Sequence, residues 1–106
     1  MKAILAGPDE DGLGDELRER NVDVAVVEGI VNRPALEEAG VVTAELFVLT
    51  DLEQATAIPI AKDLNEDVRV VVYDRNSLPA FASRQTDIAI DPDLLGPDAV
   101  AEELTG

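Results

Sequence analysis

The stretch KAILAGPDEDGLG, residues 2–14, decides the fold of this chain. It opens with the short aliphatic run Lys2–Ala6 and continues into a turn with glycines at positions 7, 12 and 14. Leu13 and Leu17 lie four residues apart and form the apolar stripe of a helix that we predict within residues 12–21. A buried strand that passes through a glycine-containing turn into a helix is the opening unit of a doubly wound α/β sheet.

Four further aliphatic runs of strand length follow, and segments with helix signals separate them. The runs are Val22–Val27, Glu45–Thr50, Val68–Tyr73 and Asp87–Ile90. The helix segments between and after them are Asn32–Gly40, Asp51–Asn65, Ser77–Arg84 and a last one that starts at Gly96. Nearly continuous β-branched runs are typical of parallel strands covered on both faces. We therefore predict a single Rossmann-like α/β domain over residues 1–106, with a small doubly wound parallel sheet of about five strands in the order 2-1-3-4-5 and helices on both faces.

Three of the helix segments carry signals at their ends. The segment Asn32–Gly40 opens on asparagine, has an early proline and closes on glycine, as a two-turn helix does. Residues 51–54 have the pattern of a capping box. Pro59 follows within the same segment, and a proline in a helix interior costs about 3 kcal/mol, so this helix either kinks there or begins later. Ser77 is expected to cap the next helix.

The charge excludes several classes of function. The chain carries 23 acidic and 8 basic residues, a net charge of −15, while 46% of its residues are hydrophobic. Such a surface argues against binding nucleic acid or an anionic membrane through a basic patch. The chain has no Cys and no His, which removes thiolate nucleophiles, Ser-His triads and the commonest metal ligand. No apolar run approaches the roughly 20 residues that cross a bilayer, and no signal peptide is evident. We expect a cytoplasmic protein that is not an enzyme, holds no metal and does not insert into a membrane.

The loop after the first strand matches the dinucleotide fingerprint G-x-G-x-x-G in part. Gly7 and Gly12 hold its first and third glycine positions, whereas the middle position is Asp9. Pro8 lacks an N–H, so the loop is either a weakened phosphate site or an acidic turn whose glycines serve sterics alone. Glu28 lies 21 positions after Gly7 at the end of the second strand. An acid there is placed to bond a ribose hydroxyl, or it is one more surface carboxylate.

A second interpretation of the same strand ends is a receiver-like phosphoacceptor pocket, in which carboxylates hold Mg²⁺ beside an aspartyl phosphate. Its candidate residues are Asp9, Glu10, Asp51 and Ser77. That chemistry also needs a lysine after the fifth strand, where the sequence has Asp91. Arg75 follows the fourth strand and could reach a phosphate, although neutralising its neighbour Asp74 is the commoner outcome.

From Gly29 onward the chain resembles the TrkA-N domains of the RCK (KTN) regulators of potassium transport. Residues Gly29–Gly40 and Ala44–Asp51 are similar to the family stretch GDAT…L-x-x-A-G…A-D-x-x-x-x-x-T. Glu53–Asn65 closes like the family's next helix, A-K-x-L-N, and two further segments match its last two strands. The resemblance spans nearly the whole chain. The chain looks like a small, stand-alone haloarchaeal relative of the family.

The resemblance implies a dimeric regulatory module that senses NAD(H) or an adenine nucleotide at the carboxyl edge of the sheet. The cofactor-binding candidates are Gly7, Asp9, Gly12, Glu28, Thr50 and Asp51. By position, Gly7 and Gly12 would frame the pyrophosphate and Glu28 would hold a ribose. Thr50 and Asp51 would line the floor of the cleft. The alternatives are a degenerate Rossmann domain without a ligand that binds a partner protein, and the receiver-like phosphoacceptor.

The basic residues predict how stability depends on salt. Only Lys2 and Lys62 are lysines, and a large acidic excess with little lysine is typical of selection in concentrated salt. At about 1 M salt the Debye length is about 3 Å, so the surface carboxylates no longer repel one another strongly. We predict that the melting temperature rises with KCl and that dilute buffer loosens or unfolds the protein. Thermal unfolding followed by circular dichroism across a KCl series tests this, and a melting temperature independent of salt would contradict it.

Overall fold

The computed structural model describes all residues, 1–106. Its centre is a five-stranded sheet in the order β2-β1-β3-β4-β5, and every neighbouring pair is parallel. The strands are β1 (Lys2–Ala6), β2 (Asp23–Val27), β3 (Leu46–Leu49), β4 (Arg69–Tyr73) and β5 (Ile88–Ile90). The predicted sheet and strand order are confirmed, and each of the four later strands begins one residue inside its predicted run.

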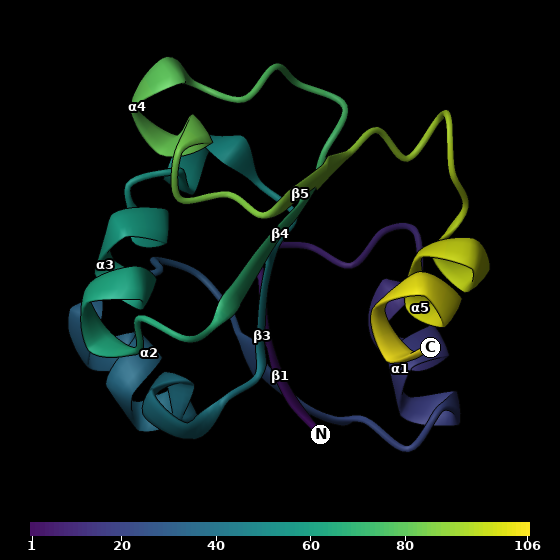
Figure 1. Cartoon of the computed structure of the whole chain (residues 1–106), viewed down its shortest axis with the longest axis horizontal. Helices are drawn as coiled ribbons and strands as arrows, with labels where there is room; N and C mark the ends of the chain where they lie inside the picture. The colour runs from purple at the N-terminus through teal and green to yellow at the C-terminus, as the bar shows by residue number, and fades with distance from the viewer.

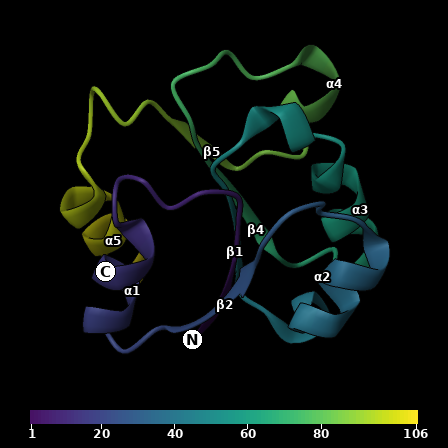
Figure 2. The same cartoon turned by 180° about the vertical axis from the view of Figure 1, so that it is seen from behind.

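Helices cover both faces of this sheet, as predicted (Figures 1 and 2). On one face lie α1 (Leu13–Glu19) and α5 (Pro97–Thr105). On the other lie α2 (Arg33–Ala39), α3 (Ala57–Leu64) and α4 (Ala80–Ser83). Two single 3₁₀ turns, η1 (Val41–Thr43) and η2 (Leu52–Gln54), flank β3. The longest helix, α5, has nine residues, and none of the helices has the length and apolar character to span a membrane.

The sheet divides the core into two apolar clusters. Ile4 and Ala6 of β1 point into the cluster beneath α2, α3 and α4, while Ala3 and Leu5 point into the cluster beneath α1 and α5. This alternation is the two-residue period of a strand with both faces covered. No polar or charged side chain is buried. The charge of the chain therefore lies on the outer helix faces, in the loops and at the first residues of β1, β2 and β4.

The ends of α2 form as the sequence predicts. The Asn32 side chain accepts a hydrogen bond from the Ala35 N–H at 3.0 Å, which satisfies one of the free N–H groups of the first turn. Gly40 ends the helix with φ 92°, a conformation that glycine adopts without strain.

The next two helices begin later than their cap signals indicate. Asp51 accepts from the Glu53 N–H at 3.0 Å but opens only the turn η2, and α3 starts at Ala57. Pro59 therefore lies in the first turn of α3, where its missing N–H has no helical partner to lose. Ser77 does not cap α4: the cap position is Pro79, and a residue before proline avoids the helical region, so the helix cannot start earlier.

Phe47 is the largest fully buried side chain and joins the cluster beneath α2, α3 and α4. We predict that Phe47→Ala lowers the free energy of unfolding by about 3–5 kcal/mol, because it removes buried contacts and leaves a cavity. The free energy of unfolding of most small proteins is only about 5–15 kcal/mol in total. Phe81→Ala is the matched control: Phe81 is 58% exposed, and its removal changes stability by no more than about 0.5 kcal/mol. Urea unfolding at constant KCl measures both, and equal losses would contradict this assignment of the core.

Candidate functional site

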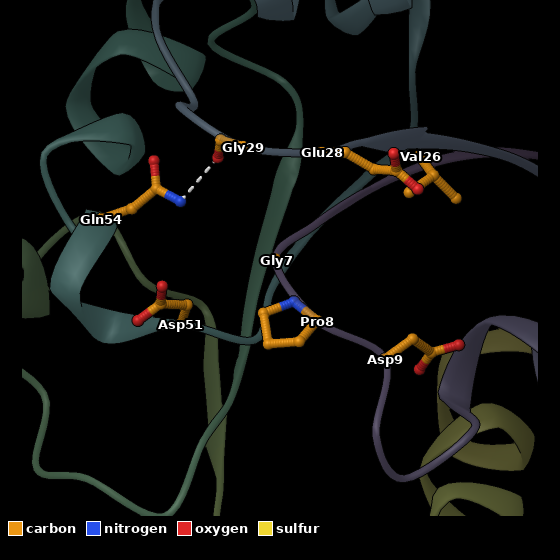
Figure 3. A pocket seen from close by; sticks show the side chains of 8 residues that line it. All are labelled: Gly7, Pro8, Asp9, Val26, Glu28, Gly29, Asp51 and Gln54. Carbon is orange, nitrogen blue, oxygen red and sulfur yellow. Dashed lines mark hydrogen bonds between the residues drawn. The ribbon is translucent and has the colours of Figure 1, made fainter.

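A cleft of about 440 Å³ opens at the carboxyl ends of β1, β2 and β3 (Figure 3). It is lined by Gly7, Pro8, Asp9, Val26, Glu28, Gly29, Asp51 and Gln54. The strand β1 lies between β2 and β3, so the chain leaves the centre of the sheet first to one side and then to the other. Open α/β sheets bind ligands at this switch point. The cleft therefore occupies the position at which the sequence predicted a site.

Four of the six predicted site residues line this cleft and two do not. Those that line it are Gly7, Asp9, Glu28 and Asp51. Gly12 lies at the cap of α1 with φ 81°. The Thr50 hydroxyl is engaged by the first loop, and it lies 2.6 Å from the Pro8 carbonyl oxygen to which it donates. Thr50 thus ties the end of β3 to the glycine loop instead of facing the cleft.

The two glycines of the partial fingerprint serve different steric needs. Gly7 has φ 105°, and a Cβ there would overlap the Thr50 hydroxyl oxygen. Gly12 has open space around its Cα, so only its positive φ favours glycine. Close packing and backbone conformation account for both glycines without a phosphate.

Asp9 stands at the middle position of the fingerprint, where a glycine would let the backbone approach a phosphate. Its Oδ2 accepts a hydrogen bond from the Gly14 N–H at 3.1 Å, at the first turn of α1. In Figure 3 the Asp9 side chain turns toward this helix. A Cβ on Gly14 would lie only 2.8 Å from the same carboxylate oxygen, so the absence of a side chain at Gly14 admits the carboxylate. The Gly14 N–H, in the first turn of α1, is therefore already paired with an anion of the chain itself.

Gln54 closes the opposite wall of the cleft. Its Nε2 donates to the Gly29 carbonyl at 2.9 Å, drawn in Figure 3, and its Oε1 accepts from the Val31 N–H at 2.6 Å. The expected capping box is therefore wrong in its second half, because the Gln54 side chain bonds the loop after β2 instead of its own turn. Sequence reasoning placed Pro8 in the candidate loop only as a residue that weakens it, and it did not name Val26, Gly29 or Gln54 as lining residues. Nothing in the local pattern of these three residues marks them, since only the folded loops bring them together.

The cleft is acidic and contains no cation. Asp9, Glu28 and Asp51 contribute carboxylates, and none of them forms an ion pair. No lysine or arginine lines the cleft. The electrostatic potential in it therefore favours a neutral or cationic group.

Arg75 joins three loops on the other side of the carboxyl edge. Its guanidinium lies 3.1 Å from Asp11 in the loop after β1 and 2.9 Å from Asp93 in the loop after β5. These two hydrogen-bonded carboxylates raise the pKa of Arg75 above its usual range. The expected pairing with Asp74 is wrong, because the Asp74 carboxylate accepts the Leu52 N–H at 2.7 Å instead. Arg75 is thus occupied and does not face the cleft.

Tyr73 anchors the loop after β5. Its hydroxyl donates to the Leu95 carbonyl at 2.9 Å. Burial, followed by the nearby charge of Asp11, raises the pKa of the Tyr73 hydroxyl above 10.0. The hydroxyl keeps its proton at neutral pH and remains a hydrogen-bond donor.

The structure brings the candidate residues of the phosphoacceptor interpretation together only in part: Asp9 and Asp51 line the cleft, and Glu10 and Ser77 do not. No three acidic side chains in the structure are grouped as ligands of one metal ion. The Asp51 carboxylate accepts the Glu53 N–H, while Asp9 faces α1. Both carboxylates accept backbone N–H groups, and the receiver-like interpretation stays a prediction.

The sheet order, the two helix layers and the cleft at the switch point define a Rossmann-like α/β fold. The chain belongs to a family of unknown function, DUF7126, whose profile matches residues 3–104. The sequence matches no protein of curated function.

Several solved structures share this fold at low sequence identity. An orphan response regulator of H. pylori has a TM-score of 0.72 and 17% identity, over 97% of this chain and 92% of that chain. A protein of Burkholderia pseudomallei described as pilus assembly-related has a TM-score of 0.68 and 15% identity, over 98% and 86%. The TrkA-N domain of the inner membrane protein YbaL from Escherichia coli has a TM-score of 0.64 and 18% identity, over 97% and 93%. At these identities the likeness shows the fold alone.

The Asp9 contact predicts a difference between neighbouring acids. We predict that Asp9→Ala lowers the free energy of unfolding by about 1–2 kcal/mol, because it leaves the Gly14 N–H unpaired at the start of α1. Glu10→Ala is the matched control, since Glu10 is exposed and makes no side-chain hydrogen bond or ion pair; it changes stability by about 0.5 kcal/mol or less. Urea unfolding of both variants at one KCl concentration makes the comparison, and equal effects would contradict a specific role of Asp9.

Proposed function

We propose that this chain is a non-catalytic regulatory module that works by binding a partner protein and does not bind a nucleotide. The observation that carries the proposal is the hydrogen bond from the Gly14 N–H to Asp9. In a dinucleotide-binding loop the first turn of this helix receives the pyrophosphate. Here a carboxylate of the same chain occupies that turn.

The magnitudes favour exclusion of a diphosphate. A helix N-terminus stabilises an anion by about 0.3–1 kcal/mol at an exposed site. Two like charges about 4 Å apart repel by about 1 kcal/mol in water and about 4 kcal/mol at the effective dielectric constant of a protein surface. A diphosphate in the cleft would meet three carboxylates, no cation and a proline that has no N–H to offer. The repulsion exceeds what the helix end supplies.

Composition and structural relatives support a regulatory role over a catalytic one. The chain has no His and no Cys, so it lacks the side chains that most often act as general base or nucleophile near neutral pH. Its structural neighbours include a response regulator and a TrkA-N domain. These descriptions belong to those proteins, and they agree with a module that transmits a signal by contact.

The second candidate is a TrkA-N-type sensor of NAD(H) or an adenine nucleotide, acting as a dimer. Glu28 is the observation that favours it. Glu28 lines the cleft at the end of β2, 21 positions after Gly7, and has no cation partner. A carboxylate there is free to accept hydrogen bonds from the hydroxyls of a ribose.

Nucleotide titration separates the two candidates. We predict that calorimetry with NAD, NADH, ATP, ADP and AMP shows no saturable binding to the wild-type chain, in KCl of about 2–3 M, where repulsion is screened. Asp9→Gly restores the middle glycine of the fingerprint and removes the competing carboxylate, so we expect measurable binding of a nucleotide to this variant. Glu10→Gly is the matched control and gains no binding.

Saturable binding to the wild-type chain would overturn the proposed function. If Glu28→Gln also weakened that binding at least tenfold, the sensor would be the correct assignment.

A further inference from the structure

The strand β2 forms an open edge of the sheet. It lies at the end of the strand order, and its only partner is β1. The Asp23 N–H donates to the Met1 carbonyl at 2.9 Å, and the Val27 carbonyl accepts from Gly7 at 3.4 Å, so these residues face β1. Because hydrogen-bonding groups alternate along a strand, Val24 and Val26 turn their N–H and C=O groups away from the sheet. These groups are a ready template for another strand.

Apolar surface lies along the same edge. A second hollow, of about 320 Å³, is lined by Val26, Val27, Ala35, Glu38 and Ala39. Val26 lines both this hollow and the cleft, so the two depressions adjoin at the edge of β2. Val26 is 44% exposed, and Ile30, which follows the cleft residue Gly29, is 76% exposed. An incoming segment would find pockets for apolar side chains beside the free backbone groups.

The charges around the edge are of one sign. Asp9, Glu28 and Asp51 line the cleft, and Glu38 lines the hollow. None of these four carboxylates forms an ion pair, and no lysine or arginine lines either depression. Elsewhere, five of the eight basic side chains of the protein are paired with acids. Glu28, directly after β2, and Glu38, in α2, therefore present unpaired negative charge beside the edge.

We infer that the open edge of β2 binds an extended segment of another protein in which Val, Ile or Thr alternates with Lys or Arg. The segment adds to the sheet as a sixth strand and pairs its backbone with Val24 and Val26. Alternate side chains enter the two depressions, and the cations between them meet the unpaired carboxylates. Five residues of strand span roughly 17 Å, the reach of β2 itself. The inference rests on the proposed function and names the surface and the partner chemistry for it.

A second copy of this chain fits the edge poorly. Two copies, each with a net charge of −15, would bring the same unpaired carboxylates against one another. Such a contact adds repulsion where a cationic segment adds attraction.

A blocked heptapeptide that alternates Val with Lys or Arg tests the inference on the full chain. Binding is followed through the backbone amide signals of the ¹⁵N-labelled protein, at the lowest KCl concentration at which the spectrum is that of the folded chain. We expect the amides of Val24 and Val26 to shift and to gain protection from hydrogen exchange. The affinity falls at least tenfold when Glu replaces each cation of the peptide, and binding is lost when Pro replaces its central Val, because proline cannot donate to the ladder.

Variants of the protein provide the matching controls. Val26→Lys places a cation on the edge and weakens binding of the cationic peptide at least tenfold. Val42→Lys makes the same change at another exposed valine, in η1, which lines neither depression, and leaves the affinity within twofold. Thermal unfolding of both variants checks that each is folded, and the Glu and Pro peptides test the inference on the wild-type chain in any case.

Four outcomes would overturn the inference. The first three are no binding of the cationic peptide, equal binding of the Glu peptide, and amide shifts that avoid β2. A fourth is a shift of Val24 and Val26 with protein concentration alone, which would make a second copy the occupant. If the peptide fails while the nucleotides also fail to bind, only the β2 surface is wrong; saturable nucleotide binding would instead overturn the proposed function itself.

Discussion

The structure depends on a parallel sheet that is covered on both faces. All four residues of β3, Leu46–Leu49, are buried, and the strands on either side of it are almost as fully enclosed. Side chains on such strands have no contact with water, so each must be apolar or fully paired. In this protein every buried side chain is apolar, since no polar or charged side chain is buried. Chemistry is thereby confined to the strand ends, the helix exteriors and the open strand edges.

At the strand ends the loops are held by contacts within the chain. Thr50 donates to the Pro8 carbonyl, Gln54 bonds the loop after β2, and Arg75 joins acids in two other loops. Asp9 completes this set by pairing with the first turn of α1. A loop that awaits an anion leaves backbone donors free, whereas here the Gly14 N–H is paired with Asp9 and the Val31 N–H with Gln54. The cleft thus has the shape of a Rossmann ligand site, and a backbone donor in the first turn of α1 is already in use.

Local signals predicted the elements well, and long-range contacts account for the errors. The helix α2 carries its own cap, proline and terminal glycine, so its bounds follow from residues 32–40 alone. Gln54 and Arg75 were assigned to near neighbours, but their partners lie 18 or more positions away. Asp9 was predicted in part. Its position in the loop was evident from the sequence, whereas the direction of its side chain toward Gly14 depends on how α1 packs on β1. The sequence near a residue does not reveal which hydrogen-bond partners the folded loops bring to it from distant positions.

The placement of charge gives the open edge of β2 its selectivity. Exposed edges invite pairing between identical chains, and proteins commonly oppose this with charge. β2 begins with Asp23 and is followed by Glu28, and neither forms an ion pair. The same acids that repel a second copy attract a cationic strand. The acidic residues beside β2 therefore oppose self-association and favour a cationic partner. Salt weakens both effects together, because at about 1 M the Debye length of about 3 Å is shorter than the spacing between strands. In concentrated salt the backbone groups and Val26 would then provide most of the affinity, and the acids would act only on cations in direct contact.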